Sequence, residues 1–388
     1  MKEEWKKVKL GEISADIQTG PFGSQLHMSD YSEKGIPVVM PKDMINGKIT
    51  EENIARVTDN HVKRLNRYII SSGNILYARR GDVGKCVYVS EKESGWLCGT
   101  GCLRININTA IANPKFVFFQ LQKTETIGWV EKNAVGATML NLNTSILANV
   151  PLHLPPLPTQ QKIASILSAY DDLIENNRKQ IKLLEEAALK LYKEWFVKLN
   201  FPGHETTKIA DGVPDGWKKE KVGNLISTLS KTKQIKTSEI KKTGKIPVID
   251  QSRDFIAGYT DDLESLISPK KPVIVFGDHT RILKLIQFPF ARGADGTQTF
   301  ISINENIQEY QLFCALIEID LSSYSYARHF KYLKEELVFV PTKEISNRFE
   351  SFATSSYKMI QKLRDQIQLL QSARDKLLPK LMNGEIEV

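Results

Sequence analysis

Two carboxylates and a lysine in the second half of the chain have a spacing that could support metal-dependent hydrolysis. Pro214-Asp215 is followed by Glu239-Ile240-Lys241, and carboxylates in this order could hold a metal ion while the lysine supports an attacking water. The pattern is degenerate, so chance matches are common. Asp215 also lies in a linker just before Trp217, where the first half carries Glu3-Glu4 before Trp5. A nuclease built on these residues is therefore an alternative interpretation, not the favoured one.

Other catalytic and metal-binding patterns are missing from the sequence. It has no P-loop, no GxGxxG that opens a helix, no Gly-x-Ser-x-Gly and no His-Glu-x-x-His, and its six histidines lack metal-ligand spacing. Cys98 and Cys102 could form half of a zinc site, but no second ligand pair follows, so small buried cysteines are the simpler interpretation. Apart from the nuclease alternative, the sequence offers no catalytic, metal-binding or cofactor motif.

The charge of the chain indicates a polyanionic partner. Its 388 residues carry a net charge of +8, the pI is near 9.0, and a basic excess favours nucleic acid. Six lysines lie between Lys231 and Lys245, with Glu239 as the one acid among them. No apolar run approaches the ~20 residues that span a bilayer, and Met1-Lys2-Glu3-Glu4 is no signal peptide. We expect a cytoplasmic protein with reduced cysteines.

The chain repeats itself once. Trp5-Lys6-Lys7 is matched by Trp217-Lys218-Lys219, and Ile36-Pro37-Val38-Val39 by Ile246-Pro247-Val248-Ile249. Each copy ends in a long amphipathic helix, and the helices align at an offset of 186 residues. This period is far longer than the about 20–50 residues of a solenoid unit. The sequence therefore predicts two copies of a unit made of a domain and a helix. Such a molecule would perform the same function at two positions.

Shorter patterns predict elements inside the first copy. Asn74–Ala78 and Lys85–Val89 are apolar runs that flank a Gly-containing turn, which is typical of a β-hairpin. Pro114–Gln122 has the pattern of a short helix. In the second copy, Pro272–Gly277 repeats the pattern of the hairpin's first strand.

Each copy should lead into its helix at a proline boundary. Pro155-Pro156-Leu157-Pro158-Thr159 and Pro341-Thr342 stand at the two junctions, and Thr is a good N-cap, so we expect a helix just after each. In the first helix a 4-3 apolar spacing continues for about 37 residues, roughly 55 Å at 1.5 Å per residue. This spacing forms an apolar stripe along each helix, and each stripe needs a partner to bury it. We expect the two helices to pair with each other along a seam made of both stripes. The predicted seam contains Ile163, Leu167, Tyr170, Ile174, Ile181, Leu184 and Leu191 in the first helix, and Ile360, Leu363, Ile367, Leu370 and Leu377 in the second.

The predicted fold class is α+β. Two repeated α/β domains are separated by two long helices, which pair as an antiparallel coiled coil with pseudo-two-fold symmetry. The predicted segments are a first domain over 1–154, a first helix over 155–200, a linker over 201–216, a second domain over 217–340 and a second helix over 341–388.

Four segments carry a resemblance to a known family. They are the junction Leu154-Pro155-Pro156-Leu157-Pro158-Thr159-Gln160-Gln161-Lys162-Ile163, the N-terminal Leu10-Gly11-Glu12-Ile13 with Thr19-Gly20-Pro21-Phe22-Gly23-Ser24, the stretch Arg178–Leu191 and the closing Lys376–Ile386. With them the chain resembles the DNA-specificity subunit of type I restriction–modification systems over essentially its whole length. The second junction departs from the pattern, because only Val340-Pro341-Thr342 remains there.

The resemblance implies a non-catalytic DNA reader whose domains are target-recognition domains. Each would read one half of a split DNA sequence, while the coiled coil sets the gap and docks two adenine methyltransferase subunits. ATP-driven restriction subunits would join to cut unmodified DNA. S-adenosylmethionine, ATP and magnesium would belong to those partners, and the target adenine would be flipped into the methyltransferase.

Residues for DNA contact follow from the chemistry of each contact. Phosphates are bound by Lys, Arg and backbone amides, and bases by Arg, Asn or Gln. The Gly-rich loop could equally be a turn needed for folding, and adjacent strand residues point opposite ways, so at most one of Arg79 and Arg80 should face DNA. The expected contacts are Thr19, Gly20, Gly23, Ser24, Lys42, Arg79 and Arg80 in the first domain, and Lys231, Lys233, His279, Arg281 and Arg292 in the second.

Partner docking is expected at the end of the first helix. Tyr192, Trp195 and Phe196 should be exposed there, and aromatic residues are enriched as interface anchors. Trp195 also fits the coiled-coil seam. Two other classes of protein stay open: a stand-alone DNA-binding or decoy protein, and the nuclease based on Asp215, Glu239 and Lys241.

Overall fold

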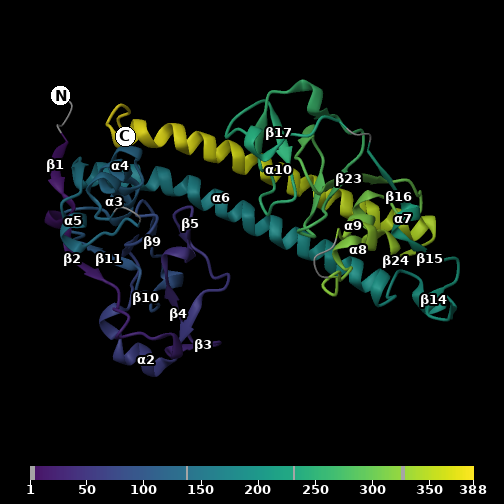
Figure 1. The fold of residues 1–388 in the computed structure, drawn as a ribbon, viewed down its shortest axis with the longest axis horizontal. Helices are drawn as coiled ribbons and strands as arrows, with labels where there is room; N and C mark the ends of the chain where they lie inside the picture. Colours follow the sequence, from purple (N-terminus) through teal and green to yellow (C-terminus); the bar gives the residue numbers. More distant parts are fainter. Residues whose placement is uncertain (1–4, 137–138, 230–231, 325–327) are drawn as a thin grey trace. The chain divides into compact units, whose positions relative to one another are not determined.

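The structure is a computed structural model that describes residues 5–136, 139–229, 232–324 and 328–388. The chain divides into two compact units. Unit 1 comprises Met1–Ile174 and Leu369–Val388, and unit 2 comprises Glu175–Gln368. Each unit contains one sheet-rich domain and a part of both long helices (Figure 1).

Unit 1 contains two four-stranded sheets, a short ribbon and a small hairpin of β5 (Met44–Ile45) and β6 (Lys48–Ile49). The first sheet has the order β2-β11-β8-β9 and is antiparallel, and the second has the order β10-β4-β7-β3, in which β10 and β4 are parallel. The predicted hairpin is confirmed, because Tyr77 of β8 pairs with Cys86 of β9. The strands are β2 (Ser14–Thr19), β11 (Cys102–Ile107), β8 (Ile75–Ala78), β9 (Cys86–Tyr88), β10 (Leu97–Cys98), β4 (Ile36–Val39), β7 (Ala55–Val57) and β3 (Tyr31–Ser32), with β1 (Lys6–Lys9) paired to β12 (Pro151–Leu154) in the ribbon.

Helices cover the first sheet of unit 1. The predicted short helix is confirmed as α3 (Pro114–Leu121), which begins where the Asn113 side chain accepts a hydrogen bond from the Phe116 amide. Pro114 suits the first helical position because its missing N–H is not needed there. Phe116 and Leu121 of α3 are fully buried in one core with the strand residues Ile75 and Leu103.

Unit 2 repeats the antiparallel sheet and the parallel strand pair of unit 1, but in its second sheet the parallel pair is central, whereas in unit 1 it lies at the end of the sheet. One sheet has the order β16-β23-β20-β21, and the other has β18-β17-β22-β19 with β17 and β22 parallel. Ile36–Val39 and Ile246–Ile249 form the matching strands β4 and β17, so the repeat predicted from these residues is confirmed. The strands are β16 (Ile226–Thr228), β23 (Thr297–Ser302), β20 (Val273–Gly277), β21 (Leu283–Ile286), β18 (Gly258–Thr260), β17 (Ile246–Ile249), β22 (Phe290–Arg292) and β19 (Leu266–Ile267), with β15 (Lys218–Lys221) paired to β24 (Leu337–Val340).

The two long helices are α6 (Leu157–Tyr192) and α10 (Lys343–Met382). Helix α10 begins directly after Thr342, as predicted. Helix α6 begins at Leu157, earlier than the expected start after Thr159, because Pro158 fits the first turn, where no intrahelical N–H donor is required. After Tyr192, α6 continues as a π-helical turn over Lys193–Val197.

The helices pair in antiparallel fashion within each unit. In unit 1, Asp171 of α6 binds Arg374 of α10 at 2.6 Å, while the earlier Ile163 shares a core with the later Leu381. In unit 2, Asn177 donates to Gln366 at 3.2 Å and Tyr192 stacks edge-on to Phe349. Ile163, Leu167, Ile174, Ile360 and Leu363 of the predicted seam are buried, and Tyr170, Ile181, Leu184, Leu191, Ile367, Leu370 and Leu377 are half-buried.

The expectation that the aromatic residues at the end of α6 are exposed is wrong for two of them. Tyr192 is 5% exposed and Phe196 is 1% exposed, and both pack against Phe349, with Phe196 also 5.6 Å from the ring of Trp217. Trp195 is half-buried in the same cluster. Their large apolar area closes the core of unit 2, so Tyr192 and Phe196 have no free surface for a partner.

Across the described ranges, no helix is long and apolar enough to cross a membrane.

Candidate nucleic-acid interface

Loops of unit 1 meet at one edge of its two sheets. The Gly20 amide donates to the Cys102 carbonyl at 2.9 Å, the Arg79 amide to Gly101 at 2.8 Å, and the Gly99 amide to Val39 at 2.9 Å. These bonds hold together the segments that follow β2, β4, β8 and β10. We call this the unit 1 edge: Thr19–Ser24, Met40–Asp43, Arg79–Gly84 and Gly99–Gly101. All the first-domain residues proposed for DNA contact lie on it.

The glycines of the Thr19–Ser24 loop have different roles. A Cβ at Gly20 would stand 1.9 Å from the Gly99 carbonyl oxygen, so only glycine allows this close approach of two backbones. A Cβ at Gly23 would meet no described atom within 4 Å. Gly23 and Ser24 are exposed, while Gly20 is buried. Gly20 therefore acts in packing, and the exposed end of the loop is available for contact.

Arg79 and Arg80 differ in their surroundings, as the alternation of strand side chains requires. The Nε of Arg79 donates to the Leu142 carbonyl at 3.2 Å, and its guanidinium lies 5.6 Å from the centre of the Phe22 ring. Burial, and then the charge of Arg80, lower the pKa of Arg79. Arg80 is exposed, as is Lys42, whose Nζ donates to the Asn53 carbonyl. Three cations thus stand on the unit 1 edge with an aromatic ring beside one of them.

Unit 2 presents an edge of the same construction. The Gly293 amide donates to the Ile249 carbonyl at 2.8 Å, which matches the bond from Gly99 to Val39 in unit 1. His279 and Arg281 follow β20 as Arg79 follows β8, and both are exposed. We call this the unit 2 edge: Asp250–Arg253, Asp278–Arg281 and Gly293–Gly296.

Gln251 is a residue of the unit 2 edge that the sequence analysis missed. Its side-chain Oε1 accepts from the His279 amide at 3.1 Å, and its Nε2 donates to the Asp295 carbonyl at 2.9 Å. Its backbone carbonyl accepts from the Thr280 hydroxyl at 2.7 Å. One residue thereby joins three loops. Its position after Ile246–Ile249, the counterpart of Ile36–Val39, is the one sequence signal that could have found it.

The other second-domain candidates are less available. Arg281 has a left-handed backbone (φ 62°) and donates to the Leu321 carbonyl. Arg292 is buried in β22, burial lowers its pKa, and its Nε has no hydrogen-bond partner among the described residues. Lys233 binds Asp262 at 2.7 Å, which raises the pKa of Lys233. Lys231 lies outside the described residues.

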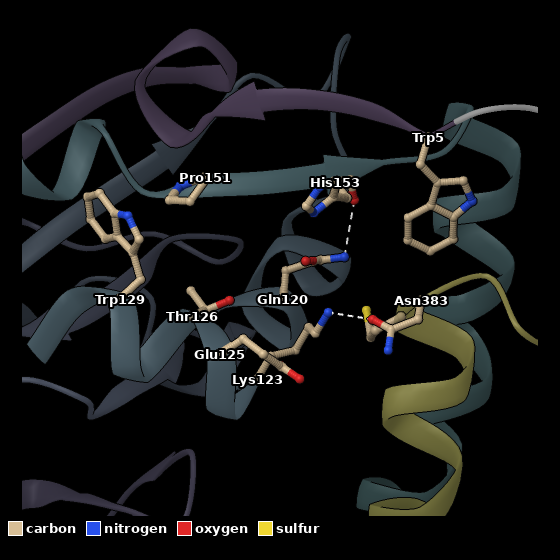
Figure 2. Close-up of a pocket in the computed structure, with 10 residues that line it drawn as sticks. Trp5, Gln120, Lys123, Glu125, Thr126, Trp129, Pro151, His153 and Asn383 are labelled. Atoms are coloured by element: carbon tan, nitrogen blue, oxygen red, sulfur yellow. Dashed lines mark hydrogen bonds between the residues drawn. The ribbon is translucent and has the colours of Figure 1, made fainter. Parts of the chain in front are cut away.

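Unit 1 also has an open cavity of about 500 Å³ away from its edge. Figure 2 shows Trp5 and Trp129 at opposite sides of it. Lys123 donates to the Asn383 side chain at 2.6 Å, and Gln120 donates to the His153 carbonyl at 3.1 Å. Burial, then the charges of Lys123 and Lys7, lower the pKa of His153. The cavity lies where residues near both chain ends meet, beside β12, α3 and α4 (Thr124–Asn133).

The residues of the nuclease alternative each have a different partner. The Asp215 amide bonds to the Lys208 carbonyl, the Glu239 carboxylate accepts from the Lys236 amide, and Lys241 binds Asp261 at 2.9 Å. Within the part of the chain that the structure describes, no group of three or more His, Cys, Asp or Glu residues is placed to hold a metal ion.

The fold and the two matching edges define a class of protein: a duplicated sheet-rich domain combined with two long helices. Comparison with known proteins shows what this chain is similar to. Residues 2–186 match the type I restriction modification DNA specificity domain. The resemblance stated from the sequence is confirmed.

Relatives extend the similarity beyond residue 186. The chain is 26% identical to the type I restriction enzyme MjaIX specificity subunit of Methanocaldococcus jannaschii, over all of this chain and 94% of that protein. It is 27% identical to the HindI specificity subunit of Haemophilus influenzae, over 54% of this chain and 44% of that one. Its fold is similar to the crystal structure of a type I restriction–modification S subunit from M. genitalium, with a TM-score of 0.63, 17% identity, and coverage of 98% and 96% of the two chains.

Proposed function

We propose that this chain is the non-catalytic DNA-reading subunit of a type I restriction–modification complex, with one half of a bipartite target read by each unit. The observation that carries the proposal is that the two edges share a scaffold but differ in side chains. The unit 1 edge presents Phe22, Arg79 and Arg80, and the unit 2 edge presents His279 and Arg281. Equal scaffolds with different donors suit two different half-sites.

The positive charge of the unit 1 edge supports DNA as the ligand. Arg79 and Arg80 can neutralise phosphates, and an arginine can also bind guanine with two hydrogen bonds. The paired helices would set the gap between the half-sites. S-adenosylmethionine, ATP and magnesium would be bound by the partner subunits, and the methylated adenine would be flipped into the methyltransferase.

Docking of two methyltransferase subunits is proposed for one side of the helix pair. Leu173 and Leu369 in unit 1, and Leu183 and Met359 in unit 2, are exposed, and each stands directly before a seam residue. In each unit, that position places both residues on the same flank of the seam. The opposite flank carries Asp171, Glu185 and Arg364, which follow seam residues and form ion pairs. An exposed apolar flank is typical of a partner interface.

The docking proposal is tested by co-purification. Leu183→Asp with Met359→Asp should strip the methyltransferase subunits from this chain and leave its DNA binding intact. Lys179→Asp with Lys358→Asp is the matched control, because both lysines are exposed on the same helices but away from this flank. Retention of the methyltransferase by the Leu183/Met359 variant would move the docking site elsewhere.

The proposed function itself is tested by combining this chain with the methyltransferase subunit of its own locus. We expect sequence-specific adenine methylation that needs both subunits. DNA binding with no methylation in the combined preparation would support the decoy alternative. Magnesium-dependent DNA cleavage by this chain alone, abolished by Asp215→Ala, would support the nuclease alternative.

A further inference from the structure

An exposed aromatic ring stands among the cations of the unit 1 edge. Phe22 is 52% exposed, and Arg79 lies over its ring. Val135 and Met139 are also exposed, and Val135 and Arg80 both form backbone bridges with Asn141. Single exposed apolar residues are ordinary, but an exposed ring in contact with one arginine, on an edge that carries two more cations, suggests a surface that meets a ligand with both apolar and anionic parts.

The turn that carries Phe22 is held rigidly. The side-chain Oε1 of Gln25 accepts from the Phe22 amide at 3.2 Å and from the Tyr68 hydroxyl at 2.7 Å. The Gln25 amide donates back to the Phe22 carbonyl at 2.8 Å, and Tyr68 is buried. Gly20 fixes the other side of the turn through its close approach to Gly99. The ring is therefore presented to solvent by a preorganised loop, which limits the entropy lost on binding.

We propose that Phe22 is an apolar base contact of the first domain. When the unit 1 edge meets duplex DNA, the ring packs against base edges or enters between two base pairs, while Arg79 and Arg80 hold the adjacent phosphates. Apolar side chains serve both purposes in DNA-binding proteins, by contact with thymine methyl groups and as wedges at base steps. The inference rests on the proposed function and adds the kind of contact that one residue makes.

Salt dependence separates this role from a phosphate contact. Each phosphate neutralised by a cation releases counterions and steepens the fall of affinity with salt, whereas an apolar contact releases none. Loss of the ring should therefore lower affinity at every salt concentration without changing the slope. Loss of Arg80 should reduce the slope by about one.

The experiment measures DNA binding by the full chain, together with its methyltransferase subunit, over a range of salt concentrations. The probe is a labelled duplex that carries the target mapped by methylation. Phe22→Ser should weaken binding roughly tenfold or more, as base contacts by aromatic residues do, with an unchanged slope. Phe22→Leu keeps an apolar wedge and should retain most of the affinity. Ile111→Ser is the matched control, because Ile111 is 45% exposed but follows the opposite end of β11; its binding should equal that of the wild type.

Three results would overturn the inference. Unchanged binding by Phe22→Ser would show that the ring makes no contact. Weaker binding with a reduced slope would show that Phe22 acts only by positioning Arg79. Loss of the methyltransferase from the Phe22→Ser chain, with its DNA binding intact, would make the ring a protein anchor. A wild-type complex that binds no specific duplex would instead contradict the proposed function.

Discussion

At the residue scale, Glu350 shows how burial raises the pKa of a carboxyl group. It is 8% exposed, and its two oxygens accept from the Tyr310 and Gln311 amides at 3.2 Å each, at the start of α8 (Glu309–Ile317). Burial raises the pKa of Glu350 to about 7, although the two amides act to lower it. Between about pH 4.5 and 7 the folded chain keeps a proton that the unfolded chain releases. The contribution of Glu350 to the free energy of unfolding therefore falls as pH rises through this window.

Glu350→Gln should remove this pH dependence. Relative to the wild type, the free energy of unfolding of the variant should rise between pH 5 and 7 by up to about 1.4 kcal/mol per pH unit. Urea denaturation at pH 5, 6 and 7 measures the difference. Glu344→Gln, an exposed change on the same helix, should follow the wild type. Parallel pH profiles for Glu350→Gln and the wild type would contradict the raised pKa.

Gln251→Glu tests how the unit 2 edge is held. The carboxylate can still accept from the His279 amide, but it faces the Asp295 carbonyl with an acceptor in place of a donor. We expect the 293–296 loop to separate and the methylation motif to become degenerate in one half only. Gln308→Glu, a similar change at a side chain that binds Asn347, is the control. Degeneracy in both halves, or in neither, would contradict a positioning role.

Sequence reasoning located the edge residues that directly follow apolar strands. Arg79, Arg80, His279 and Arg281 lie there because a strand end fixes where the next side chains emerge. Gln251 was missed because a network made by one amide leaves no periodic pattern. Tyr192 and Phe196 were misjudged because aromatic type alone does not tell which face of a helix is covered.

At the element scale, the strands and the seam were predictable for a simple reason. A 4-3 spacing kept over five heptads leaves one stripe to bury, and antiparallel pairing buries it in both units. The start of α6 was misplaced because prolines are compatible with a first helical turn as well as with the loop before it. Asn177, a polar residue that occupies a seam position between Ile174 and Ile181 of α6, is buried and donates to Gln366. A polar residue at a seam position favours one register and lowers stability.

Asn177→Leu should therefore stabilise the helix pair of unit 2. Burying an apolar side chain in place of the amide should raise the free energy of unfolding by about 1 kcal/mol or more, measured as a shift in the thermal midpoint. Asn176→Leu, at an exposed neighbouring position, should change it by less than about 0.5 kcal/mol. A lower midpoint for Asn177→Leu would mean that the bond to Gln366 outweighs the cost of burying the amide.

At the scale of the whole molecule, the main feature is duplication with divergence. Each unit has a parallel strand pair, β4 with β10 in unit 1 and β17 with β22 in unit 2, beside an antiparallel sheet. In each unit, loops meet at the corresponding edge of the sheets. The edges then differ in every residue proposed to contact DNA. A protein that reads one continuous sequence has no need of two edges built alike, whereas a split target needs both.

The most direct test is a map of methylated adenines made by the complex of this chain with its methyltransferase. It should be made for the wild type, for Phe22→Ser, and for His279→Ala with Arg281→Ala. We predict a wild-type motif of two short halves with a fixed gap, and relaxed specificity in a different half for each variant. A continuous motif, or relaxation of the same half by both variants, would contradict the account.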